Sequence, residues 1–152
     1  VLSRTSKWNR DGIRYGLLQE DYSHCPWRLL IACVLMSRVS SVSVKTRCIN
    51  DFFEKYPTPS AVLDNSFNPA SAYEILRPLG LFENRLRSCV EISKKFLQMA
   101  TFDVGLTPYL KIYGVGEFGC NSFTIFIRDG AEDLYPKDKN LARYCNSKRN
   151  NL

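Results

Sequence analysis

The segment "YGVGEFG", from Tyr113 to Gly119, places three glycines within seven residues of a chain that has only eight glycines in 152 residues. The sequence on both sides of it has a helical pattern. Glycine permits positive φ and leaves no side chain between the backbone and a ligand. The amides of residues 115–119 would then lie unpaired at a helix N-terminus, where the helix dipole favours an anion. The segment predicts a phosphate-binding hairpin, although a plain turn with a glycine at a helix end has the same pattern.

A single carboxylate follows this hairpin at a defined distance. Asp138 stands 138 − 116 = 22 residues after Gly116, directly before the last predicted helix in "YPKDKNLARY". A carboxylate held beside a nucleic-acid backbone can stabilise positive charge that develops on a sugar, and it can orient water. The simpler interpretation is an aspartate that caps the helix. Both interpretations are open at this point.

The composition is that of one globular domain with a basic surface. The chain has a formal net charge of +6 and a pI of about 9.1, which favours a polyanionic partner without establishing one. The apolar run at 29–36 is far shorter than the ~18 residues of a membrane span, so we expect no membrane association. Because the chain begins at Val1, we expect a C-terminal catalytic fragment of a longer protein, with a basic arm at 1–15 and one domain at 16–152.

The cysteines do not have the spacing of metal ligands. Six cysteines are spread along the chain without a Cys-x-x-Cys pair, and His24 is the single histidine. We therefore predict no metal site and no iron–sulfur cluster. Cys33 and Cys89 fall within apolar helical patterns, where a buried free thiol is typical. This use of cysteine indicates a reducing compartment, either the nucleus or the cytoplasm.

The elements that would position these residues are all predicted to be helices. Apolar residues recur with the helical period, and little of the chain alternates with period two, so the predicted fold class is all-α. The segment 26–38 is apolar nearly all round and is predicted to be a central buried helix. The other predicted helices lie at 41–56, 58–65 (capped by Thr58), 68–76 (capped by Asn68), 85–100, 107–113, 118–130 and 139–148.

Five blocks of the sequence, in order, resemble one known family. They are "QEDYSHCPWRLLIACVLMSR", "FFEKYPTPSAV", "LRPLGLFENR", "YGVGEFGCNSFTIF" and "YPKDKNLARY", and they extend from Gln19 to Tyr144. Together they resemble the helix-hairpin-helix DNA glycosylase superfamily, and within it the mismatch-specific thymine/uracil glycosylase domain of methyl-CpG-binding domain proteins. The resemblance implies a compact helix-hairpin-helix glycosylase fold. It also implies a nuclear, monomeric enzyme of base excision repair that acts on double-stranded DNA with G·T or G·U mismatches.

The resemblance assigns roles to the hairpin and to the aspartate. Asp138 matches the catalytic aspartate of the family. The phosphate-binding hairpin corresponds to Gly114, Val115 and Gly116, and Gly119 follows in the same DNA-binding segment. No metal and no organic cofactor are implied.

Three further residues match DNA-contacting or base-contacting positions of the family. Leu81 matches a residue that wedges into the duplex, and Arg38 matches an arginine that contacts DNA around the vacated site. Gln19 matches a glutamine of the base pocket, whose donor and acceptor suit the imide edge of a pyrimidine. Each has a simpler alternative: Leu81 as a core residue, Arg38 as a cation at a helix C-terminus, and Gln19 as an ordinary polar residue near a helix start.

Phe118 is a departure from the family pattern. Relatives that also cleave the DNA strand carry a lysine at this position, where its amine attacks the sugar. Phenylalanine has no nucleophile, so the resemblance implies a monofunctional enzyme that leaves an intact abasic site. In thymine-specific relatives the position tends to be tyrosine. Phe118 keeps a ring for stacking in the base pocket but loses the hydroxyl, which affects thymine recognition more than uracil recognition.

A second departure concerns the residues that follow the aspartate. Other relatives place a four-cysteine iron–sulfur loop there, whereas this chain has only Cys145 after Asp138. The resemblance therefore implies no cluster, in agreement with the cysteine spacing.

Two other functions compete with a glycosylase. A non-catalytic helix-hairpin-helix DNA-binding module would need the hairpin but neither Asp138, Gln19 nor the loop around Leu81. An all-α protein-interaction domain with incidental basicity would have no salt-sensitive affinity for DNA. Since the sequence has all of these features together, it predicts a monofunctional DNA glycosylase that removes thymine or uracil mispaired with guanine.

Overall fold

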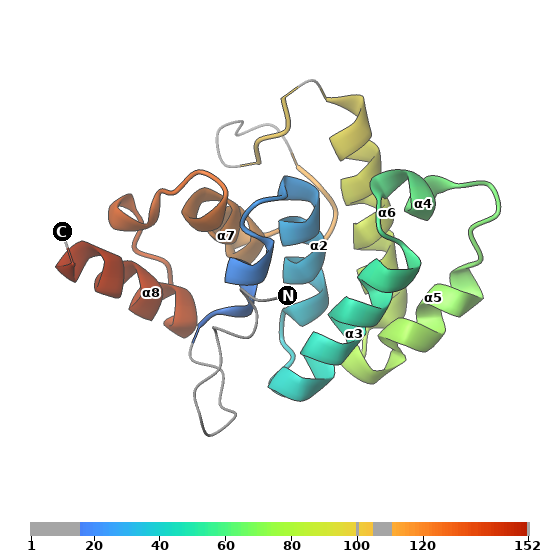
Figure 1. Ribbon diagram of the computed structural model, residues 1–152, viewed down its shortest axis with the longest axis horizontal. Helices are drawn as coiled ribbons and strands as arrows, with labels where there is room; N and C mark the ends of the chain where they lie inside the picture. Colours follow the sequence, from blue (N-terminus) through green and yellow to red (C-terminus); the bar gives the residue numbers. More distant parts are fainter. Residues whose placement is uncertain (1–15, 100, 105–110, 152) are drawn as a thin grey trace.

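The computed structural model describes residues 16–99, 101–104 and 111–151, and every regular element in these ranges is a helix (Figure 1). The all-α prediction is confirmed for this part of the chain. The basic arm expected at 1–15 lies outside the described residues. The elements are η1 (Leu18–Tyr22), α2 (Pro26–Met36), α3 (Val42–Lys55), α4 (Pro59–Leu63), α5 (Pro69–Leu76), η2 (Arg77–Leu79), α6 (Phe82–Gln98), α7 (Glu117–Phe126), η3 (Ala131–Asp133) and α8 (Lys139–Asn150).

α2 is the central helix, as predicted. Apart from Pro26 and Arg28, all of its residues are buried, and Leu29, Leu30, Ile31, Ala32 and Leu35 have no exposed surface. It packs against α6, α7, α3 and η1, and Figure 1 shows it between the α3–α6 side of the molecule and the α7–α8 side. Burial of an apolar side chain stabilises a fold by roughly 1.5–3 kcal/mol, so α2 organises the core. 

α3, α4 and α5 each begin at a residue whose side chain caps the helix. α3 buries Cys48, Ile49, Phe52 and Phe53, whereas Val42 is 43% exposed at the first helical position. The side chain of Thr58 caps α4, and that of Asn68 caps α5, as predicted.

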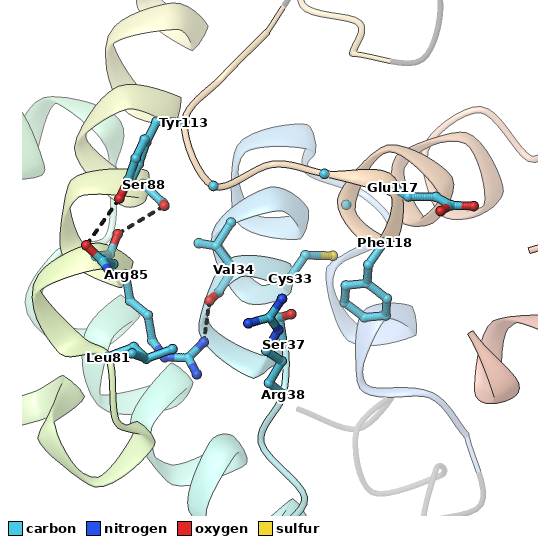
Figure 2. A pocket seen from close by; sticks show the side chains of 14 residues that line it. Cys33, Val34, Ser37, Arg38, Leu81, Arg85, Ser88, Tyr113, Glu117 and Phe118 are labelled. Atoms are coloured by element: carbon cyan, nitrogen blue, oxygen red, sulfur yellow. Dashed lines mark hydrogen bonds between the residues drawn. The ribbon is translucent and has the colours of Figure 1, made fainter. Parts of the chain in front are cut away.

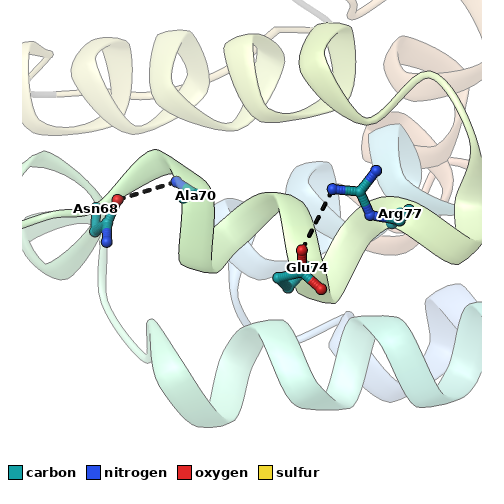
Figure 3. A network of polar contacts seen from close by, with 4 residues as sticks. All are labelled: Asn68, Ala70, Glu74 and Arg77. Atoms are coloured by element: carbon teal, nitrogen blue, oxygen red, sulfur yellow. Dashed lines mark hydrogen bonds and ion pairs between the residues drawn. The ribbon is translucent and has the colours of Figure 1, made fainter.

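Figure 3 shows the start and the end of α5. Asn68 Oδ1 accepts a hydrogen bond from the amide of Ala70 at 3.1 Å, and Arg77 pairs with Glu74 at 3.3 Å. Both members of that pair are mostly exposed, so the pair contributes little to stability. The Asn68 cap supplies an acceptor that the first turn of the helix lacks.

Some predicted boundaries are wrong. α2 ends at Met36 rather than at residue 38, because Ser37 leaves the helical conformation with ψ 129°. α6 begins at Phe82 rather than at residue 85, because Leu81 adopts a left-handed conformation and its carbonyl accepts the first helical bond from Arg85 N at 2.9 Å. The expected helix at 107–113 lies mostly outside the described residues, and its last part, 111–113, is not helical.

The C-terminal helix packs against the segment that leads into it. α8 contacts η3, buries Leu141 and Cys145, and places Tyr144 against Phe126 with ring centroids 4.9 Å apart. This packing fixes the direction of the loop that carries Asp138. Among the helices of the described residues, none combines the length and the apolarity that a membrane span requires.

A buried hydrogen-bonded chain joins α2 to α6. Trp27 Nε1 donates to Ser93 Oγ at 2.9 Å, and Ser93 Oγ donates to the carbonyl of Cys89 at 2.7 Å. Trp27 is 1% exposed and Ser93 is fully buried, so water cannot replace either partner. The serine therefore satisfies the indole N–H in the middle of the core.

We expect Ser93→Ala to lower the free energy of unfolding by about 1–3 kcal/mol, because it leaves a buried indole donor without a partner. Urea denaturation followed by tryptophan fluorescence measures the change. Ser147→Ala, at an exposed position of α8, is the matched control and should change stability by less than about 0.5 kcal/mol. Equal effects of the two substitutions would contradict the proposed role of Ser93.

Candidate active site

The predicted site residues line two neighbouring cavities. The first, of about 600 Å³, is the hairpin cavity, and its walls include Arg38, Leu81, Gly114, Gly116, Phe118 and Gly119. The second, of about 840 Å³, is the aspartate cavity, and its walls include Gln19, Arg38, Lys45, Phe118, Asp138 and Arg143. Arg38, Phe118 and Ser37 line both cavities, so the two spaces adjoin at these side chains. Val115 lines neither cavity and packs at the edge of the core.

The hairpin glycines have different physical roles. Gly114 has φ +82°, and a Cβ built there would lie 1.8 Å from Ser88 Oγ on α6. This position therefore needs glycine for the turn and for packing against α6. A Cβ at Gly116 would meet no atom within 4 Å, so its surface is open on the cavity side. The expectation that a glycine lets a ligand approach the backbone fits Gly116. At Gly114, glycine is needed because any side chain would collide with Ser88.

The start of α7 offers backbone donors to the hairpin cavity. Gly116 is the N-cap of α7, and no side chain caps this end of the helix. The first amides of a helix lack intrahelical acceptors and lie at the positive end of its dipole. Gly119 is buried in the first turn, where its Cβ position lies 3.0 Å from Val115 Cγ1. This geometry suits an anion at the amides after Gly116, and Gly119 lets Val115 pack closely.

Asp138 is both a helix cap and a cavity residue. Its Oδ2 accepts a hydrogen bond from Leu141 N at 3.0 Å, which makes it the N-cap of α8. The residue is half-buried and lines the aspartate cavity. A carboxylate has two oxygens, and the capping bond uses one of them. The capping role and a chemical role are therefore compatible in this geometry.

Cationic side chains surround Asp138. Arg38, Lys45 and Arg143 line the same cavity. Burial lowers the pKa of Lys45 from its ordinary value, and the negative charge of Asp138 acts against this shift. Arg38 and Arg143 are exposed, so water solvates their charges, whereas Lys45 is half-buried. The cavity therefore combines one carboxylate with an excess of positive charge, which favours an anionic ligand.

Gln19 brings a buried amide to the aspartate cavity. It is 4% exposed within η1, an element that the sequence analysis did not predict. Its Nε2 donates to Ser122 Oγ at 3.4 Å, from η1 to α7. This bond fixes the orientation of the amide and leaves Oε1 and the second Nε2 proton for another partner.

Leu81 and Arg38 are held in unusual backbone conformations on the walls of the hairpin cavity. Leu81 has φ +48° and is 59% exposed, so it is not a core residue. Arg38 has φ +65° and follows the end of α2. Left-handed conformations of non-glycine residues cost about 1–3 kcal/mol each and cluster at functional sites. Figure 2 shows both side chains beside the same cavity, with the Phe118 ring across from Leu81.

Arg85 positions both of these segments, and the sequence analysis missed it. Its Nε donates to the carbonyl of Gly80 at 2.8 Å. Its Nη1 donates to the carbonyl of Val34 at 2.8 Å (Figure 2). The residue is 7% exposed, and burial lowers the pKa of its guanidinium. The last carbonyls of α2 carry the negative end of the helix dipole and so stabilise this cation. The sequence contained one indication that Arg85 is buried: it lies four residues before Cys89, on the face of α6 that points into the core.

The described residues contain no cluster of three His, Cys, Asp or Glu side chains that could hold a metal ion. All six cysteines are free thiols. Burial raises the pKa of the Cys33 thiol to about 12, so it stays protonated at neutral pH beside the hairpin cavity. Carboxylate, amide, aromatic and cationic side chains line the two cavities.

Comparisons with known proteins support a relationship to DNA glycosylases. No family model matches the chain. The chain is 27% identical over 129 residues to a methyl-CpG-binding domain protein 4-like protein of Arabidopsis thaliana, which is 85% of this chain and 27% of that protein. It is 30% identical over 69 residues to a thymine-DNA glycosylase of Aeropyrum pernix, which is 45% of this chain and 30% of that enzyme. The chain thus spans less than a third of either relative.

We expect Gly114→Ala to lower the free energy of unfolding by about 2–4 kcal/mol, because the added methyl group meets Ser88 and the backbone is left-handed. Thermal and urea denaturation measure the loss. The matched variant Gly116→Ala, with φ −106° and open space around the new atom, should fold with nearly unchanged stability. If the two variants were equally stable, the packing role of Gly114 would be refuted.

We expect Arg85→Met to cost about 2–4 kcal/mol of folding stability, because it removes a buried donor from the carbonyls of Gly80 and Val34. The matched control is Arg87→Met on the same helix. Arg87 is exposed and stacks on Tyr113 at 3.9 Å, so its loss should cost less than about 1 kcal/mol. Urea denaturation of both variants tests the difference, and similar costs would contradict a special role for Arg85.

Proposed function

We propose that this chain is a monofunctional DNA glycosylase that removes thymine or uracil mispaired with guanine from double-stranded DNA. The observation that carries the proposal is that Asp138 and Gln19 line one cavity, which adjoins the hairpin cavity at Arg38 and Phe118. The similarity to a thymine-DNA glycosylase and to a methyl-CpG-binding domain protein 4-like protein supports it. As a repair enzyme of this kind, it would act as a monomer in the nucleus. Residues 16–152 would form its helix-hairpin-helix glycosylase domain.

DNA binding would begin at the hairpin. A backbone phosphate would approach the open surface at Gly116 and accept hydrogen bonds from the first amides of α7. The net charge of +6 would add an attraction that weakens with salt. These contacts carry no base specificity and serve to place the duplex across the two cavities.

Extrusion of the mismatched pyrimidine would follow. Mismatched bases cost less to unstack than paired ones, by up to a few kcal/mol. Leu81 is exposed and follows Gly80, whose carbonyl is bound by Arg85, so it would enter the duplex as a wedge. Arg38 lines both cavities and would contact the DNA at the gap that the base leaves.

The aspartate cavity would then receive the base. Gln19 keeps an acceptor and a donor free, which matches the imide N–H and a carbonyl of thymine or uracil. Phe118 would stack on the ring. Phe118 lacks the hydroxyl of a tyrosine. We therefore expect the ratio of uracil release to thymine release to be higher than in an enzyme that has tyrosine at this position.

The chemical step would be hydrolysis of the N-glycosidic bond. As the bond from C1′ to the base breaks, positive charge develops on the sugar, and the Asp138 carboxylate would stabilise it. Water would add to C1′ and pass its proton to the same carboxylate. With phenylalanine at 118 there is no amine at the family's lyase position, so the product would be an intact abasic site.

Single-turnover base release from G·T, G·U and matched A·T duplexes tests this function, with Asp138→Asn beside the wild type. Asparagine can still accept the capping bond from Leu141 N, so the fold and DNA binding should remain. We expect the wild type to release base from both mismatches only, and the variant to be about 10²–10³-fold slower. If the wild type binds all three duplexes equally and releases nothing, Asp138 is only a cap and the domain is a DNA clamp.

A further inference from the structure

Lys45 is a cation of the aspartate cavity to which neither the sequence nor the proposed mechanism assigns a role. It lies in the first turn of α3 and lines the cavity together with Gln19 and Asp138. It is half-buried, and its ammonium forms no ion pair or hydrogen bond within the part of the chain that the structure describes. A partly desolvated ammonium without a partner costs folding free energy, so a ligand that completes it is expected.

We propose that Lys45 is a catalytic residue that stabilises the pyrimidine anion as it leaves the sugar. This inference rests on the proposed glycosylase function. When the C1′–N1 bond breaks heterolytically, the bonding electron pair stays on the base and is shared with its carbonyl oxygens. The ammonium of Lys45 would donate a hydrogen bond to a carbonyl oxygen of that anion. Solvent later protonates the base at nitrogen, and Lys45 keeps its own proton throughout.

The placement of opposite charges in one cavity supports this role. Asp138 carries the negative charge that the developing sugar cation needs, and Lys45 carries the positive charge that the departing base needs. The two groups are close enough that the charge of Asp138 influences the titration of Lys45, yet no ion pair joins them in the described structure. The cavity therefore keeps its carboxylate and its ammonium apart, so that each can serve one product of bond cleavage.

A DNA phosphate is the other anion that could bind Lys45. Phosphate contacts are made by solvated side chains at the surface, such as the exposed Arg38 and Arg143 on the same cavity. Lys45 is more buried than either of them and shares its cavity with the buried amide of Gln19. Its position therefore favours the base over the backbone.

Leaving-group dependence distinguishes the two anions. Single-turnover rates are measured with uracil and with 5-fluorouracil opposite guanine, because the fluorine stabilises the base anion without help from the protein. For Lys45→Met we expect the uracil rate to fall about 10- to 30-fold and the 5-fluorouracil rate to fall only about 3-fold. The rate with 5-fluorouracil divided by the rate with uracil should thus rise several-fold. Lys45→Arg, which keeps a donor and a charge, should restore most of the uracil rate.

Arg47→Met is the matched control, since it removes the same charge from an exposed position of α3 that lines neither cavity. It should leave both rates and their ratio unchanged. If Lys45→Met slows the release of both bases equally, the inference is overturned. It is also overturned if the only change is in the slope of log binding constant against log salt concentration, by about 0.9, because Lys45 then holds a phosphate. Absence of base release by the wild type would instead overturn the proposed function itself.

Discussion

The burial of α2 is the constraint on which the rest of the molecule depends. A helix that is apolar on nearly all sides must be covered on all sides, and here α6, α7, α3 and η1 cover it. Each of these elements carries a residue of the two cavities at the end that projects beyond the core. Gln19 lies on η1, Lys45 starts α3, Leu81 precedes α6 and Phe118 starts α7. Residues far apart in the sequence therefore meet because one helix has to be buried.

The site also contains conformations that the rest of the fold has to stabilise. Leu81 and Arg38 have positive φ. Arg85 binds the carbonyl of Gly80, directly before Leu81, and that of Val34 in the last turn of α2, which precedes Arg38. A buried guanidinium without a carboxylate is itself costly. The apolar burial of α2 and α6 offsets these costs, since each buried side chain contributes roughly 1.5–3 kcal/mol. Strain at the cavity walls is therefore compatible with a stable domain, and the bond from Arg85 to Gly80 restrains the backbone beside the exposed Leu81.

The sequence predicts those features of the fold that depend only on residues close together in the chain. The central helix, the Thr58, Asn68 and Asp138 caps and the glycine turn follow from periodicity, capping preferences and glycine's freedom, and the structure has all of them. Tertiary contacts decide the rest. The early start of α6 depends on the left-handed Leu81, and the roles of Arg85 and Lys45 depend on which elements lie opposite them. The face of α6 that Arg85 shares with Cys89 indicates that Arg85 is buried, but it does not indicate which carbonyls Arg85 binds.

In the proposed function, the aspartate cavity is the feature that distinguishes an enzyme from a DNA clamp. A clamp needs donors and cations at its surface, and the hairpin with exposed arginines already supplies both. The buried Gln19 amide joins η1 to α7 through Ser122, but its free oxygen and the half-buried ammonium of Lys45 have no role in a clamp. Partly desolvated polar groups cost stability unless a ligand completes their interactions. Gln19, Lys45 and Asp138 converge on one space. The proposed function accounts for this cost, because a pyrimidine nucleotide has polar edges and separates charge as its glycosidic bond breaks.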